Sequence, residues 1–235
     1  MSDVGENLAD VSVKIAAACA RAGRDPSTVE LIAVSKTFPV GSVREAMEAG
    51  QLHFGESKLQ EAESKIPMLS GQLHWHFIGR LQRNKIRKLL PQFQVIHAID
   101  SFRLAAYADE VAKELGLFPK VFVQVNVGGE ESKGGFDAEE LRTEFGNLLA
   151  LKRLEIIGLM CIPPEGPDAE SARKWFVLLR ELRDSLEAGS HVRLPFLSMG
   201  MSSDYEVAIE EGATHVRVGS AIFGKRSYRV DGELG

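Results

Sequence analysis

The sequence lacks the features that mark membrane, secreted and disulfide-stapled proteins. It has only two cysteines, Cys19 and Cys161, without metal-ligand spacing, and a chain of 235 residues needs no disulfide framework to fold. No apolar run reaches the length of a membrane-spanning helix, and the first residues contain neither the basic nor the apolar segment of a secretory leader. We therefore expect a cytoplasmic protein without a membrane partner.

An excess of positive charge is also missing. The sequence has 28 Lys and Arg against 33 Asp and Glu, a net charge of −5, so no overall field favours nucleic acid. Linkers, low-complexity tracts and blocks of like charge are absent as well. With 44% hydrophobic and 26% charged residues the chain can bury a full core. We predict one globular domain over residues 1–235 and expect a monomer.

A regular alternation of strand and helix patterns begins near residue 30. Before it, Leu8, Val11, Ile15 and Cys19 recur at helical spacing and predict an extra N-terminal helix. The predicted strands are Leu31–Ser35, Leu52–Gly55, Trp75–Ile78, Val95–Ile99, Lys120–Asn126, Leu154–Met160, Pro195–Ser198 and His215–Val218. Eight such units favour an α/β fold, a single (β/α)8 TIM-type barrel, although an open doubly wound sheet has the same alternation.

Helix-end signals support this placement of the elements. Three predicted helices open with a capping-box pattern, in which side chains satisfy the first amides of the helix. The pairs are Ser42 with Glu45, Asp137 with Glu140, and Ser203 with Glu206. Gly50 and Gly212 lie where helices commonly end in a glycine.

The stretch "LIAVSKTFP" places a lysine at the end of a buried strand. Leu31 to Val34 are apolar without the alternation of a half-exposed strand, which predicts burial on both faces. In a barrel, chemistry gathers at the carboxyl ends of the strands, where Lys36 follows. Lys36 is either a solvated surface charge or a Schiff-base lysine, whose pKa is lowered by apolar walls so that it attacks aldehydes and ketones.

Two later stretches predict a phosphate pocket. In "HVRVGSAIFG" an apolar strand ends at Gly219 and Ser220 and opens a short helix, whose free amides and dipole favour an anion. The stretch "LSMGMSSD" adds hydroxyl groups and a glycine on the neighbouring loop: Ser198, Gly200, Ser202 and Ser203. Ordinary helix caps and turns are the alternative interpretation of either loop.

Arg217 stands between two valines of the last strand, so it must face the barrel interior or pair with an acceptor. A lysine, a phosphate pocket and an inward arginine predict a ligand with a carbonyl group, a phosphate and a third acceptor. Pyridoxal 5′-phosphate (PLP) has all three, with its ring nitrogen as the acceptor. A sugar phosphate in a Schiff-base aldolase or lyase has the first two.

Six stretches of the chain resemble the motifs of the pyridoxal phosphate homeostasis protein family. They are "AVSKTFP", "HFGES…QEA", "WHFIGRLQRNK", "LMCIP", "LSMGMSSDYEVAI" and "RVGSAIFG", and they extend from about Leu31 to Gly224. The resemblance implies a barrel similar to the N-terminal domain of alanine racemase. It also implies a carrier or buffer that contributes to intracellular PLP homeostasis, rather than an established enzyme. The implied partners are PLP, amino acids, and PLP-dependent apo-enzymes as recipients.

The resemblance also implies roles for particular residues. Lys36 would hold PLP as an internal aldimine, and Arg217 would face the pyridine nitrogen. His76 is interpreted as a neighbour of the ring. The phosphate would lie at Ser198, Met199, Gly200, Ser202, Gly219 and Ser220. Members of the family usually have Asn-Tyr after "FGE", whereas this chain has Ser57 and Lys58, which puts one polar contact to the cofactor in question.

Three other functions remain open at this point. A PLP-dependent amino-acid racemase would need a second acid/base, and the candidate tyrosines are Tyr107, Tyr205 and Tyr228. A sugar-phosphate lyase would need a carboxylate near Lys36, such as Glu56. A protein- or RNA-binding module would rest on the basic run "RLQRNKIRK" alone. His74 and His76 share a strand face, but nothing completes a metal site around them, and we predict none.

Overall fold

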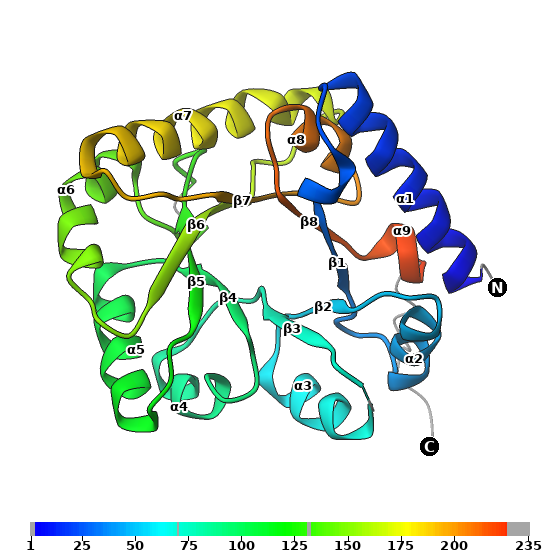
Figure 1. Cartoon of the computed structure of the whole chain (residues 1–235), viewed down its shortest axis with the longest axis horizontal. Helices are drawn as coiled ribbons and strands as arrows, with labels where there is room; N and C mark the ends of the chain where they lie inside the picture. The colour runs from blue at the N-terminus through cyan, green and yellow to red at the C-terminus, as the bar shows by residue number, and fades with distance from the viewer. Residues whose placement is uncertain (1–2, 70, 131–132, 225–235) are drawn as a thin grey trace, which may run out of the picture.

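The computed structural model describes residues 3–69, 71–130 and 133–224, and these form a closed parallel barrel (Figure 1). Its strands follow one another around the barrel in chain order, and the last strand pairs with the first. The predicted barrel is therefore confirmed, and the open doubly wound sheet is excluded. Each predicted strand is present within three residues of its expected ends. The strands are β1 Glu30–Val34, β2 His53–Glu56, β3 His74–Phe77, β4 Val95–Ile99, β5 Lys120–Val125, β6 Glu155–Cys161, β7 Phe196–Met201 and β8 His215–Val218.

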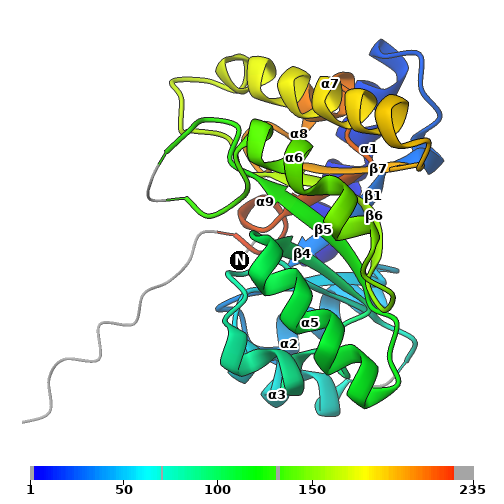
Figure 2. The same cartoon turned by 90° about the vertical axis from the view of Figure 1, so that its left-hand side faces the viewer.

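Helices surround the barrel (Figures 1 and 2). They are α1 Val4–Arg21, α2 Val40–Glu48, α3 Leu59–Lys65, α4 Ile86–Leu89, α5 Phe102–Leu115, α6 Ala138–Leu149, α7 Arg173–Ser190, α8 Tyr205–Glu210 and α9 Ser220–Phe223. Short 3-10 helices in the described part of the chain join them: Pro26–Thr28, Ile66–Met68, Arg83–Lys85 and Glu170–Ala172. In the described part of the chain, no helix is both long and apolar enough to cross a membrane.

The predicted extra N-terminal helix is α1, and it lies on the outside of the barrel beside α8 and α9 (Figure 1). Its buried positions include Leu8, Val11, Ile15 and Cys19, the four residues of the predicted stripe. The Asn7 side-chain amide donates a hydrogen bond to the Ile222 carbonyl at 2.7 Å. Because α9 has only one turn, α1 supplies cover that this last helix is too short to give.

One of the three predicted capping boxes is confirmed. Asp137 caps α6 together with Glu140. The other two are wrong, because α2 begins earlier, with Pro39 at its N-cap, and α8 begins later, with Asp204 at its N-cap. Proline's fixed φ is compatible with a helix start without a side-chain cap. Gly50 and Gly212 have positive φ just beyond α2 and α8, as predicted.

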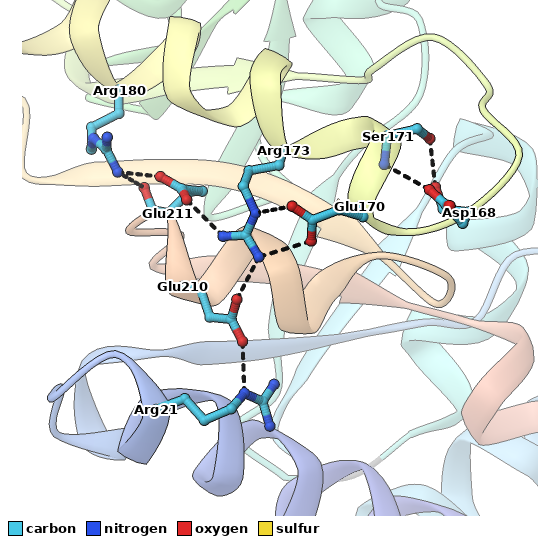
Figure 3. A network of polar contacts seen from close by, with 8 residues as sticks. All are labelled: Arg21, Asp168, Glu170, Ser171, Arg173, Arg180, Glu210 and Glu211. Carbon is cyan, nitrogen blue, oxygen red and sulfur yellow. Dashed lines mark hydrogen bonds and ion pairs between the residues drawn. The ribbon is translucent and has the colours of Figure 1, made fainter.

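Ion pairs join α1, α7 and α8 on the outside of the barrel (Figure 3). Glu210 lies between two arginines, with Arg21 Nε and Arg173 Nη2 each 2.7 Å from its carboxylate. Glu211 accepts in the same way from Arg173 Nη1 at 2.7 Å and from Arg180 Nη1 at 2.5 Å. Arg173, the first residue of α7, thus connects both carboxylates of the end of α8.

Candidate functional site

Lys36 follows β1 directly and lines a cavity of about 330 Å³ at the carboxyl ends of the strands, which we call the upper cavity. Its lining residues are Val34, Lys36, Phe38, Ile78, Ile162, Met201, Ser202, Ser203, Arg217, Gly219, Ser220 and Gly224. Lys36 is half-buried there. Both the place and the size are those of small-molecule sites in barrels of this kind.

The backbone is strained directly after Lys36. Thr37 has a φ of 71°, in the left-handed region that a β-branched residue rarely adopts. Its amide donates a hydrogen bond to Glu61 Oε2 at 2.7 Å. The first turn of α3 therefore holds the turn that carries Lys36.

Arg217 enters the upper cavity from β8 and is almost fully buried, with 5% of its surface exposed. Its Nη1 donates to Ser198 Oγ at 2.5 Å and its Nη2 to the Cys161 carbonyl at 2.8 Å. Burial lowers the pKa of Arg217, while Cys161 and Asp204 act in the opposite direction. The two neutral acceptors fix the guanidinium and leave its positive charge beside the cavity.

The two loops predicted to form a phosphate pocket lie against each other. The Gly219 amide donates to Ser202 Oγ at 3.1 Å, which joins the loop after β8 to the loop after β7. A Cβ atom at Gly219 would lie 3.3 Å from the Val34 carbonyl oxygen, so this position is tight for any larger residue. The first amides of a helix have no acceptor within it, and α9 begins here at Ser220.

The upper cavity brings together five of the nine residues predicted for the site: Lys36, Ser202, Arg217, Gly219 and Ser220. The other four are placed elsewhere. Ser198 lies beneath the cavity, between Arg217 and His97. Met199 is fully buried in the hydrophobic core. Gly200 has a φ of 92°, and a Cβ atom there would lie 2.6 Å from Ala208 Cβ, so this glycine allows α8 to pack on β7.

His76, the predicted ring neighbour, is not among the residues that line the upper cavity. It is buried in the barrel interior, where its ring nitrogens lie 3.0 Å from those of His53 and His97. It also lines a second cavity at the amino ends of the strands. Among the described residues, no group of three or more His, Cys, Asp or Glu is arranged to hold a metal ion.

The sequence interpretation missed most of the apolar wall of the upper cavity: Val34, Phe38, Ile78, Ile162 and Met201. Strand alternation could have found Val34, which is two residues before Lys36 and shares its face. Met201 could not be found in this way. The register between β7 and β8 shifts between Ser198 and Met201, so the simple alternation counted from Ser198 fails before it reaches the cavity.

Two residues on which competing functions rested are engaged away from the upper cavity. Glu56 is completely buried and accepts hydrogen bonds from Ser35 Oγ at 2.8 Å and from Lys65 Nζ at 2.7 Å. Burial raises its pKa, and Lys65 acts in the opposite direction. Tyr205 is buried on α8 and lines no part of the upper cavity.

The remaining candidates are also accounted for. The guanidinium of Arg83 stacks on the Tyr107 ring, 4.1 Å from its centre, and Arg87 pairs with Glu114, so part of the basic run is occupied by local contacts. Lys58, at the N-cap of α3, is exposed and lies 3.7 Å from Glu61 Oε1. Tyr228 lies outside the described residues.

Comparison with known proteins first defines the class. The family model "Alanine racemase, N-terminal domain" matches residues 7–227. An alanine racemase structure from Clostridium difficile has a TM-score of 0.74 and 15% identity, covering 97% of this chain and 58% of the racemase chain, a likeness of fold alone. The protein is thus a barrel of the alanine racemase N-terminal type.

Closer relatives define the family. Pyridoxal phosphate homeostasis proteins are 45% identical in Aquifex aeolicus, over 95% of this chain and 98% of the relative, and 42% identical in Escherichia coli K12, over 97% and 99%. The structure of PipY from Synechococcus elongatus PCC7942 with PLP bound has a TM-score of 0.85 and 41% identity, and covers 94% of this chain and all of PipY. The chain belongs to the pyridoxal phosphate homeostasis protein family.

Proposed function

We propose that this protein binds PLP in the upper cavity, as a carrier or buffer of the cofactor rather than as a catalyst. One observation carries the proposal: Lys36, Arg217 and the serines of two loops line the same cavity of about 330 Å³. A primary amine, a guanidinium and hydroxyl groups match the aldehyde, the ring nitrogen and the phosphate of PLP. The PLP-bound structure of the relative PipY supports the same ligand.

Each lining group has a separate task in this proposal. Lys36 Nζ is the amine that meets the aldehyde, and the apolar side chains of Val34, Phe38 and Ile162 exclude water from the ring. Ser202 and Ser220 hold the phosphate together with the first amides of α9. When bound, PLP supplies an aldehyde that condenses reversibly with amines and a ring that withdraws electrons from what is attached to it.

Arg217 is the reason to expect weak catalysis. A cation held opposite the ring nitrogen disfavours protonation of that nitrogen, and the electron-withdrawing power of the ring depends on this proton. Racemisation also needs a second acid/base across the ring from Lys36. No tyrosine of the described residues lines the upper cavity. The racemase alternative is therefore less well supported, and so is the lyase alternative, because Glu56 is paired with Lys65.

An absorption spectrum tests the covalent site. The wild-type protein mixed with PLP should show a visible band that Lys36→Ala abolishes. Lys58→Ala is the matched control, since Lys58 is exposed and its Nζ lies 3.7 Å from Glu61 Oε1. A protein that cannot be loaded with PLP, or a band retained in Lys36→Ala, would refute the assignment.

The phosphate contact is tested by omitting the phosphate. Pyridoxal should bind much more weakly than PLP, because charge-assisted hydrogen bonds worth about 1.5–3 kcal/mol each are lost. The difference should shrink in Ser202→Ala with Ser220→Ala. Equal affinity of the wild type for the two aldehydes would contradict the proposed phosphate pocket.

The carrier role is separated from racemase activity by following α-proton exchange of amino acids in deuterated water. We expect exchange far slower than ordinary enzyme turnover, which is about one per second or faster. Exchange at that rate would contradict the carrier function and support the racemase function instead.

We further propose that the protein works in the cytoplasm as a monomer and passes PLP to PLP-dependent apo-enzymes. The shared name of the relatives, homeostasis protein, supports this role. The test is activation of a PLP-dependent apo-enzyme by the loaded protein, compared with the same amount of free PLP. Activation no faster than spontaneous release of PLP would exclude direct transfer.

A further inference from the structure

Arg217 is the upper end of a column of hydrogen bonds through the barrel interior. Its Nη1 donates to Ser198 Oγ, and the same oxygen lies 2.8 Å from His97 Nδ1. Ser198 belongs to β7 and His97 to β4, which are not neighbouring strands, so this contact crosses the barrel. Ser198 and His97 are completely buried.

The column continues to the amino ends of the strands. His97 Nε2 lies 3.0 Å from His76 Nδ1, and His76 Nε2 lies 3.0 Å from His53 Nδ1. His53 Nε2 then lies 3.4 Å from Glu30 Oε2. Three imidazole rings and one hydroxyl group therefore connect the guanidinium at one end of the barrel with a carboxylate at the other.

The carboxylate at the lower end of the column determines the direction of the hydrogen bonds in it, and the guanidinium at the upper end is compatible with that direction. Arg217 can only donate, so the Ser198 hydroxyl accepts from it and keeps its own proton, with which it can donate to His97 Nδ1. A neutral His53 directs its N–H toward the Glu30 carboxylate, 3.4 Å from Nε2, and His76 and His97 must then also carry their hydrogen on Nε2, which leaves His97 Nδ1 to accept from Ser198. The reverse arrangement would leave a bare His53 nitrogen facing the Glu30 carboxylate, two acceptors without a proton between them.

The column requires neutral imidazole rings, because each contact between two ring nitrogens holds one proton. Burial provides this condition. It lowers the pKa of His53 to about 4 and the pKa values of His76 and His97 well below the ordinary value. Neighbouring histidines lower these pKa values further.

The lower end of the column opens into a cavity of about 870 Å³ at the amino ends of the strands, the lower cavity. His53, His76 and Glu30 form part of its wall. His74 also lines it and stacks on His53, with ring centres 4.6 Å apart, but His74 is not a member of the column.

We propose that Ser198, His97, His76 and His53 are positioning residues for Arg217, and that the column couples the lower cavity to the upper one. Each ring can donate to one neighbour only while it accepts from the other. A change of the hydrogen-bond partner of His53 therefore alters the hydrogen bonds of Ser198, and with them the position of the Arg217 guanidinium. The part of the proposal that concerns PLP rests on the proposed function; the direction of the column does not.

Nitrogen NMR of the histidine rings in the cofactor-free protein tests the direction. His53, His76 and His97 should each show a protonated Nε2 and an unprotonated Nδ1 at pH 7. An Nδ1–H form or an imidazolium at any of the three would overturn the column. Addition of PLP should then shift the ring nitrogens of His53, and Ser198→Ala should abolish that shift. If the chemical shifts of the His53 ring nitrogens in the wild type do not change when PLP is added, the coupling is overturned.

Ring-for-ring substitutions in the lower cavity provide the second test. His53→Phe keeps a flat ring but ends the column, and should weaken PLP binding by about threefold to tenfold, as for partial loss of one hydrogen bond. His74→Phe makes the same change in the same cavity outside the column and should leave affinity within about twofold. Equal effects of the two substitutions would contradict the coupling. If wild-type protein binds no PLP, the proposed function fails, and the ring-nitrogen measurement alone decides the column.

Discussion

Thr37 combines a strained backbone with the place next to Lys36. Its left-handed conformation costs about 1–3 kcal/mol, whereas glycine there would lose about 0.5–1 kcal/mol through the entropy of the unfolded chain. We therefore predict that Thr37→Gly keeps or raises the unfolding free energy by about 1 kcal/mol, yet weakens PLP binding because Lys36 is held less firmly. Thr37→Ala, which retains the Cβ atom and the strain, is the control for both measurements. Lower stability in Thr37→Gly than in Thr37→Ala would show that the strain is negligible.

The pair of Lys65 and Glu56 is a second prediction about single residues. Both side chains are buried, and Lys65 Nζ contacts Glu56 Oε1 at 2.7 Å and the Ser35 carbonyl at 2.8 Å. Lys65→Met should lower the unfolding free energy by about 3–5 kcal/mol, since it leaves the buried Glu56 carboxyl group without its ionic partner. The double variant with Glu56→Met should recover much of this loss in urea titrations. Lys58→Met, which changes an exposed partner of Glu61, should cost no more than about 0.5 kcal/mol.

Among the elements, the junction of α1, α7 and α8 depends on Arg173 (Figure 3). Arg173→Gln removes contacts to Glu170, Glu210 and Glu211 at once, and we predict a loss of about 1–2 kcal/mol that shrinks at high salt. Arg142→Gln removes a single exposed pair with Glu139 and should cost about 0.5 kcal/mol or less. If both variants unfold at the same denaturant concentration, the network adds nothing beyond isolated pairs.

For the whole molecule, the buried histidines predict a loss of stability in acid. The pKa of His53 is lowered to about 4 and that of His215 to about 3, from 6.5. Below pH 6.5 these histidines therefore bind protons in the unfolded chain but stay unprotonated in the folded protein. The stabilisation that these histidines contribute is complete above pH 6.5, their pKa in the unfolded chain. It falls as the pH drops below 6.5 and is lost once the pH is below their pKa values in the folded protein.

Each such histidine contributes up to about 1.4 kcal/mol per pH unit in this window. Glu30 and Glu56, whose pKa values are raised by burial, act in the opposite direction. Unfolding measured from pH 7.5 to pH 4.5 should therefore show a steeper slope in the wild type than in His53→Phe. Parallel curves for the two proteins would mean that His53 is not held neutral by the fold.

Much of the barrel could be predicted because its signals are local. Apolar strands followed by helical stripes determine β1 to β8 and α1, and positive-φ glycines mark helix ends. The N-cap pattern failed at Ser42 and Ser203, because Pro39 and Asp204 begin those helices instead. A capping pattern describes only what side chains could do, and it does not determine where packing lets the helix begin.

The sequence by itself determined the barrel class and the association of Lys36, Arg217 and the two loops, because the carboxyl ends of parallel strands meet at one face whatever the details of packing. Only the tertiary structure decided that Ser198 lies beneath Arg217, that Met201 replaces it in the cavity wall, and that His76 belongs to a column reaching the opposite end of the barrel. A register shift in β7 and contacts across the barrel between strands far apart in sequence set these positions. Neither the register shift nor the contacts across the barrel can be recognised from the local periodicity of the sequence.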